Sequence, residues 1–181
     1  MTAQISAAEA VGLLNPNQRN SGQALRHFLI ELAARGAITV RREGWRKKSF
    51  VTFSVGGASA LPPARFSADV WRSLGGEQYA GREVPAKTVV DAALMAYGSD
   101  RFRENIVLPA LVASRLVTTE KRKLLGIIPT TRYAHTAAGS ELAAHLERKL
   151  SEFASLRWKP PPDAGALRSL VDALGPAVLL A

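Results

Sequence analysis

The feature that most constrains the fold is an order of helix, strand, basic turn and strand that occurs twice along the chain. The first copy is residues 29–53, LIELAARGAITVRREGWRKKSFVTF, and the second is residues 108–133, LPALVASRLVTTEKRKLLGIIPTTRY. In both copies an apolar helical stretch ends near an arginine, and cations separate two short strands. The order predicts two β-hairpins attached to helices. Two copies do not make a solenoid, so the repeat is local.

Helical spacing of apolar residues dominates the rest of the chain. It predicts a mostly α fold, a single helical domain over residues 1–181 with β-hairpins. Ser6 is the expected N-cap of the first helix, and Pro109 is expected to bend the helix that contains it. The expected helices are 5–14, 21–35, 67–74, 86–97, 101–114, 140–158 and 164–174.

Composition limits the class of partner. The chain has 181 residues, of which 47% are hydrophobic, so it is long enough for one domain with a substantial core. Its formal net charge of +9 favours polyanionic partners such as nucleic acid, anionic lipid or phosphorylated ligands. The absence of cysteine excludes disulfides, thiolate metal sites and a cysteine nucleophile.

No group of residues has the spacing of a catalytic or metal site. His27, His135 and His145 are not at metal-ligand spacing from one another. The serines lack a nucleophile-elbow context and the glycine pairs lack the Lys-Ser/Thr of a phosphate loop. Acids such as Glu31 and Glu104 resemble solvent-facing charges on helices. We therefore expect no enzyme activity, no metal and no cofactor.

The second basic turn combines two kinds of side chain. The cations Lys121, Arg122 and Lys123 run directly into the aliphatic residues Leu124, Leu125, Ile127 and Ile128. An element at a membrane interface needs apolar side chains in the acyl boundary and cations at the head groups. The same aliphatic side chains could instead pack on Leu142 and Leu146 of the following helix. The residues alone leave both interpretations open.

The first basic turn contributes a cationic surface. Arg46, Lys47 and Lys48 follow Trp45 at its tip, and either a solvated hairpin or an anion-binding surface accounts for them. No segment reads as a secretory signal or approaches the ~20 apolar residues of a spanning helix. We therefore expect a cytoplasmic protein whose membrane contact, if any, is peripheral.

The two hairpin segments resemble those of a known family. LIELAARGAITVRREGWRKKSFVTF is similar to the helix-hairpin of the Golgi phosphoprotein family, and RLVTTEKRKLLG, residues 115–126, resembles the segment that leads into that family's hydrophobic hairpin. RWKPPPD, residues 157–163, followed by an apolar helix is also similar. The resemblance covers most of residues 20–175, with a start shorter than is usual in the family. It is compatible with a bacterial homologue.

The resemblance implies a function. Members are peripheral membrane proteins that recognise phosphatidylinositol 4-phosphate, tend to self-associate, and in some cases act as adaptors for protein clients. It implies a mostly helical fold with one protruding hairpin, from which Leu124, Leu125, Ile127 and Ile128 enter the bilayer. For the head group, Arg101 matches the first of two family arginines, Glu104 stands at the second, and Arg103 is the nearest cation. Leu25 stands at a third arginine position, next to Arg26.

A nucleic-acid-binding module is the alternative. A helix followed by a basic two-stranded tip is the outline of a winged helix, and the positive charge suits phosphate contacts. The helices before the two hairpins are rich in apolar side chains and offer few groups that could read base edges. The sequence therefore ranks nucleic acid below anionic lipid as a partner.

Overall fold

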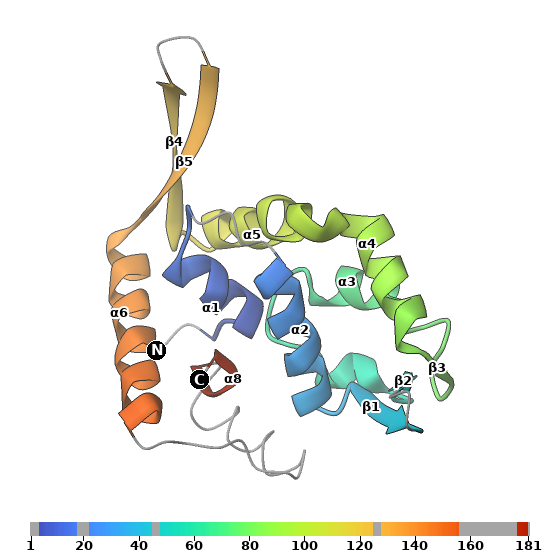
Figure 1. Cartoon of the computed structure of the whole chain (residues 1–181). Coiled ribbons are helices and arrows are strands. Elements are labelled where there is room, and N and C mark those ends of the chain that lie inside the picture. Colours follow the sequence, from blue (N-terminus) through green and yellow to red (C-terminus); the bar gives the residue numbers. More distant parts are fainter. Residues whose placement is uncertain (1–3, 18–21, 45–47, 125–127, 156–176, 181) are drawn as a thin grey trace.

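The computed structural model of the chain describes residues 4–17, 22–44, 48–124, 128–155 and 177–180 (Figure 1). Most of these residues are helical, and the strands form two separate antiparallel sheets, which confirms the predicted mostly α class with hairpins. The helix expected over 164–174 lies outside the described residues. The helices are α1 (Ala7–Leu14), α2 (Gly22–Ala34), α3 (Ser67–Ser73), α4 (Ala86–Phe102), α5 (Leu108–Ala113), α6 (Ala137–Ser155) and α8 (Ala177–Leu180), with a 3-10 turn η1 (Gly57–Ala60) and a π-helical turn η2 (Arg103–Val107).

Helix α1 occupies the centre of the helical body. It lies between α2 and α6, with α5 across its upper end and α8 near its lower end (Figure 1), and it contacts all four. Ser6 caps it as expected, because the Ser6 side chain accepts from the Glu9 N–H while the Glu9 carboxylate accepts from the Ser6 N–H at 2.9 Å. This reciprocal capping box satisfies donors that the first turn otherwise leaves without partners.

Glu31 of α2 corrects a sequence-based expectation. It is fully buried rather than solvent-facing. Its carboxylate accepts from the Ala7 N–H at 2.6 Å and from Arg35 Nε at 2.9 Å. Glu31 therefore satisfies another free donor at the start of α1 and joins α1 to α2. The positive end of the α1 dipole adds to this preference for carboxylate.

An aromatic cluster fixes α2 against the region around α3 and α4. Phe28 of α2 lies 5.7 Å from Phe66 and 6.1 Å from Phe102 between ring centroids, and Phe66 and Phe102 meet edge to face at 5.9 Å. All three rings are buried. Such tilted and edge-on pairs suit the charge distribution of aromatic rings.

The first basic turn belongs to a three-stranded sheet. Strand β1 (Ile38–Glu43) pairs with β2 (Lys48–Phe53) as predicted, and β2 also pairs with β3 (Glu83–Pro85). The order is β1-β2-β3, all antiparallel. Strand β3 was not predicted, because a three-residue strand is too short to show alternation.

The helical segment around Pro109 is divided. Helix α4 continues beyond the predicted end at residue 97, although Gly98 has non-helical angles (φ 63, ψ 161). The π-helical turn η2 then leads into α5, and Pro109 stands in the first turn of α5. Proline is tolerated at that position. The irregular backbone therefore lies at Gly98 and η2 and not at Pro109, where the bend was expected.

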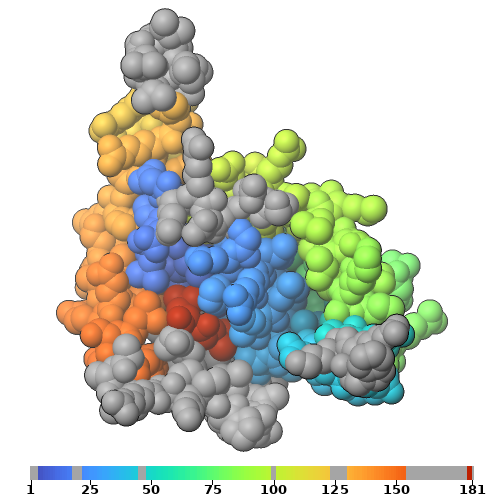
Figure 2. Space-filling model, in the orientation of Figure 1, coloured from blue at the N-terminus to red at the C-terminus, as the bar shows by residue number. Residues whose placement is uncertain are grey.

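The second basic turn lies on a long hairpin. Strands β4 (Val117–Leu124) and β5 (Ile128–His135) pair in register from Val117↔His135 to Leu124↔Ile128. The hairpin projects from the helical body (Figure 1), and the space-filling view shows its strands standing above the helices (Figure 2). The hairpin thus protrudes, as the family resemblance implies.

Candidate functional site

The outer part of the hairpin β4–β5 is positively charged. Lys121 and Arg122 of β4 and Arg132 of β5 are exposed. Arg122 forms an ion pair with Glu120 at 2.9 Å, and Glu120 lies opposite Arg132 in the ladder. The carboxylate of Glu120 offsets the charge of one of these three cations. The described outer strands therefore carry an excess of positive charge, which attracts anions.

The backbone at the outer end of the ladder lies away from the helices. Leu124 and Ile128 form its last pair (Figure 1), and Lys123 pairs with Pro129 one step closer to the body. Leu125 and Ile127 lie outside the described residues. The insertion of the aliphatic residues into a bilayer therefore stays a prediction.

The alternative packing partners lie in the helical body. Leu142 and Leu146 are buried on α6. The ladder extends in the opposite direction from α6 (Figure 1). The described strands therefore run away from Leu142 and Leu146.

Hydrogen bonds hold the base of the hairpin to the end of α1. The Asn17 side chain donates from Nδ2 to the Tyr133 carbonyl at 2.8 Å and accepts at Oδ1 from the Tyr133 N–H at 2.9 Å. The Leu13 carbonyl lies 2.6 Å from His135 Nε2, which fits a ring protonated at Nε2. His135 thus joins the hairpin to the end of α1.

A close backbone contact holds the same base to α6. Thr136 donates from its hydroxyl to the Arg115 carbonyl at 2.7 Å and accepts from the Gly139 N–H at 3.1 Å. A Cβ on Gly139 would overlap the carbonyl oxygen of Leu116. Glycine at this position therefore lets the start of α6 touch the backbone before β4, which sets the direction of the hairpin.

The first basic turn lies at the other end of the body. Hairpin β1–β2 is at the lower right of Figure 1 and β4–β5 at the upper left, so the two turns do not form one basic surface. Arg46 and Lys47 lie outside the described residues, and Lys48 is exposed. Contact between lipid and either basic turn stays a prediction.

Arg41 of β1 is occupied by acidic neighbours. It forms two hydrogen bonds with Glu83 at 2.8 and 2.9 Å, an ion pair with Glu43 at 3.3 Å, and stacks over Phe50 at 5.4 Å. The hydrogen bonds from Arg41 lower the pKa of Glu83. Arg41 therefore stabilises the sheet rather than adding to the free positive charge.

The three predicted head-group arginines have different surroundings. Arg26 is exposed on α2 and Arg101 is exposed near the end of α4. Arg103 is buried in η2, where it donates to the Asn15 carbonyl at 2.7 Å, and burial lowers its pKa. Glu104 is exposed beside it. Arg103 thus joins η2 to the end of α1, while Arg26 and Arg101 remain open to solvent.

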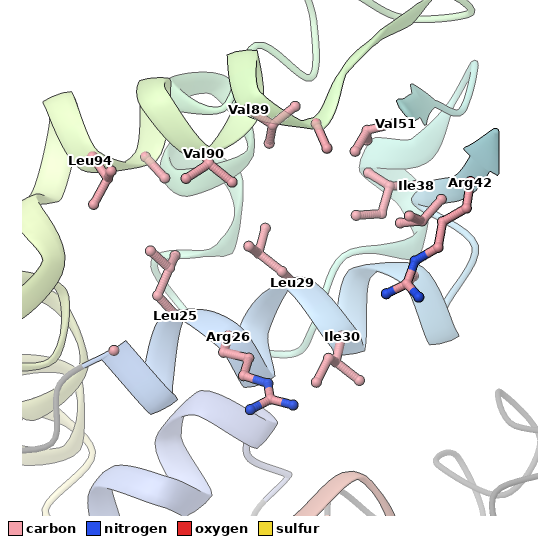
Figure 3. Close-up of a pocket in the computed structure, with 15 residues that line it drawn as sticks. Leu25, Arg26, Leu29, Ile30, Ile38, Arg42, Val51, Val89, Val90 and Leu94 are labelled. Atoms are coloured by element: carbon pink, nitrogen blue, oxygen red, sulfur yellow. The ribbon is translucent and has the colours of Figure 1, made fainter. Parts of the chain in front are cut away.

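Sequence reasoning missed an apolar groove of about 560 Å³. It lies between α2, α4 and the sheet (Figure 3), and its aliphatic lining includes Leu25, Leu29, Ile38, Val51, Val89 and Leu94. The spacing of apolar residues on α2 and α4 predicts that each helix buries one face. The structure instead leaves Leu94 44% exposed and Val90 46% exposed, because no described element covers that part of α4.

The residues that the structure describes contain no group of three or more His, Cys, Asp or Glu arranged to hold a metal ion. Among the same residues, no helix has the length and apolar content needed to cross a membrane.

Comparison with protein families gives a match over most of the chain. A search of curated proteins finds no relative. The family model described as Golgi phosphoprotein 3 (GPP34) matches residues 17–179, a range that includes both hairpins and the helices that carry them. The chain therefore belongs to the Golgi phosphoprotein 3 (GPP34) family.

Proposed function

We propose that this chain is a non-enzymatic peripheral membrane protein that binds anionic phospholipid, with phosphatidylinositol 4-phosphate as the candidate lipid. Membership of the family supports the proposal, and so does the family fold that we infer for this chain. The observation that carries it is the projecting hairpin β4–β5, whose exposed cations precede an aliphatic segment at its outer end. Self-association and protein clients are further proposals from the family resemblance.

The chain would approach an anionic membrane and remain anchored in it through different forces. Each cation near an anionic leaflet contributes about 1 kcal/mol of attraction. Burial of Leu124, Leu125, Ile127 and Ile128 would contribute about 1.5–3 kcal/mol for each side chain that is fully buried. A few aliphatic side chains are therefore sufficient to retain a chain that the cations have brought to the surface.

Co-sedimentation with liposomes tests the anchor. The double variant Leu124→Asp/Ile127→Asp places carboxylates in the aliphatic segment and should lose most of its binding to phosphatidylserine liposomes. The matched control is Val55→Asp/Met95→Asp, since Val55 is 83% and Met95 is 90% exposed elsewhere on the body. The control should pellet like the wild type. Equal pelleting of the wild type and the hairpin variant would overturn the anchor.

A second comparison tests head-group recognition. Arg101→Ala should reduce binding to liposomes that contain phosphatidylinositol 4-phosphate while leaving binding to phosphatidylserine liposomes of equal charge unchanged. The control Arg148→Ala removes an exposed arginine from α6 and should change neither. If Arg101→Ala and Arg148→Ala behave alike on both liposomes, Arg101 does not contact the head group specifically.

The geometry gives less support to nucleic-acid binding. Helix α5, which precedes the projecting hairpin, has six residues, and Leu108, Ala110 and Leu111 of this helix are buried. A recognition helix must present polar side chains to base edges. A salt titration with duplex DNA checks this ranking, and micromolar binding with a steep salt slope in the absence of liposome binding would reverse it.

A further inference from the structure

The apolar groove between α2, α4 and the sheet has charged residues only at its edge. Its lining contains two charged residues, Arg26 and Arg42, and no carboxylate. In Figure 3 the Arg26 side chain leaves α2 on the side away from α4, and the Arg42 side chain extends from β1 toward the end of α2. Neither arginine has a hydrogen-bond or ion-pair partner among the described residues. The groove thus combines an aliphatic interior with two unpaired cations at its opening.

The contrast with Arg41 shows that this arrangement is specific to the groove side of β1. Arg41 is neutralised by Glu83 and Glu43, whereas its neighbour Arg42 lines the groove without an acid beside it. Successive side chains of a strand point to opposite faces, so the alternation directs one arginine to each face. The charge at the groove is therefore complementary to an anion.

We propose that this groove binds a long-chain fatty acid, with the alkyl chain along the aliphatic lining and the carboxylate at the edge that carries Arg26 and Arg42. The volume of about 560 Å³ is within the range of sites for single small molecules. An alkyl chain needs no hydrogen-bond partner, which matches a lining whose other side chains are all aliphatic. A guanidinium pairs with a carboxylate through two parallel hydrogen bonds.

The position of the groove separates this site from the proposed membrane contact. The groove lies beside hairpin β1–β2, at the end of the body away from the outer strands of β4–β5 (Figure 1). A bilayer that receives the β4–β5 end does not face the groove, so the fatty acid would enter from solution. This site goes beyond the proposed membrane function, and of its two arginines Arg26 is also one of the predicted head-group contacts.

Calorimetric titration with decanoate below its micellar concentration tests the site. The wild type should bind one decanoate per chain, and it should bind decanol and decyltrimethylammonium at least about tenfold more weakly. The variant Arg26→Gln/Arg42→Gln should lose this preference for the anion. The control Arg82→Gln/Arg148→Gln, which removes exposed arginines elsewhere, should keep it. Absence of saturable decanoate binding, or equal binding of the three amphiphiles, would overturn the proposal.

Two neighbouring residues of α4 provide the test of location. Leu94→Asp places a carboxylate in the groove, whereas Met95→Asp makes a similar change at a side chain that is 90% exposed and does not line it. Leu94→Asp should weaken decanoate binding about tenfold, and Met95→Asp should have no effect. Equal effects of the two variants would place the fatty acid elsewhere.

Two further measurements distinguish the alternatives. Leu94→Asp should leave liposome binding unchanged, and Leu124→Asp/Ile127→Asp should leave decanoate binding unchanged, so each proposal can fail without the other. An acidic amphipathic peptide should not compete with decanoate. If such a peptide binds in a manner sensitive to Leu94→Asp while decanoate does not bind, the occupant is a protein helix and the fatty-acid site is wrong.

Discussion

At the scale of single residues, the buried carboxyls of Glu9 and Glu31 are the most unusual feature of the helical body. Both lie near the start of α1, and burial raises the pKa of each above its usual range. Hydrogen bonds from Ser6 oppose this rise for Glu9, as does the positive charge of Arg65. For Glu31 the opposing groups are the Ala7 N–H and Arg35, and the negative charge of Glu9 adds to the rise.

These shifts predict the direction of a pH effect on stability. Because both pKa values are higher in the folded chain than in the unfolded chain, the folded chain binds more protons, and stability falls as pH rises. The loss begins above the usual glutamate pKa of about 4.3 and continues through the folded values. Urea unfolding between about pH 5 and 7 should show a smaller loss for Glu9→Gln than for the wild type.

The Gln variant is a fair comparison because its amide oxygen can accept both hydrogen bonds that Ser6 makes to one Glu9 oxygen, each at 2.9 Å. A loss of stability with pH that is identical in the two proteins would contradict the prediction.

The same residues show where sequence reasoning fails at this scale. The capping box of Ser6 and Glu9 is local and was predictable in part, since the N-cap is visible as a serine before an apolar helix. The burial of Glu31 depends on Ala7, which is distant along the chain. Helical spacing reports which face of α2 is apolar, but it does not report that α1 covers this carboxylate.

At the scale of elements, the contact between Gly139 and the backbone of Leu116 fixes the base of hairpin β4–β5. Gly139→Ala would place a methyl group on the Leu116 carbonyl oxygen, so the start of α6 must shift. We expect a loss of about 1–3 kcal/mol in the free energy of unfolding, measured by urea denaturation.

Gly22→Ala is the matched control for this loss. Gly22 is the first residue of α2, and a Cβ there has no neighbour within 4 Å. Alanine favours helix over glycine, so Gly22→Ala should be neutral or stabilising by up to about 1 kcal/mol. The steric explanation fails if both variants lose the same amount.

The helix around Pro109 shows a limit of sequence reasoning for elements. Pro109 predicts a bend at its own position, but the irregular backbone lies earlier, at Gly98 and η2. Turn η2 packs against α1 where Gly12 allows close approach, since a Cβ there would lie 2.8 Å from a Val107 methyl group. That contact joins distant parts of the chain, so no local pattern reveals it.

At the scale of the whole molecule, the charges and the aliphatic segment of hairpin β4–β5 should respond differently to salt. Screening shortens the reach of charges from about 8 Å at physiological ionic strength to about 3 Å at 1 M. Liposome binding of Lys121→Gln/Arg122→Gln should therefore fall below that of the wild type at low salt and approach it at high salt. Co-sedimentation over a salt series measures this convergence.

A variant of the aliphatic segment should not converge with the wild type at high salt. Apolar burial is not screened, so Leu124→Asp/Ile127→Asp should bind less than the wild type at every salt concentration. If the two double variants show the same salt dependence, attraction and anchoring are not separate functions of the two residue sets.

The sequence predicted the hairpins, the mostly α class and the family, because alternation, helical spacing and the order of the two copies are local signals. It did not predict the groove. That feature requires α2 and α4, whose residues are distant in sequence, to lie beside one sheet, and it requires Leu94 to remain partly uncovered.

The ladder of β4 and β5 gives the hairpin the geometry of a stalk. Eight paired positions at about 3.3 Å each make it roughly 26 Å long. An upright stalk would hold the helices beyond the range in which their charges feel a lipid surface. The total charge of the chain would then matter little for docking, whereas one or two charges on the strands would matter greatly. For Arg101 to touch a head group, the stalk must lean toward the bilayer plane.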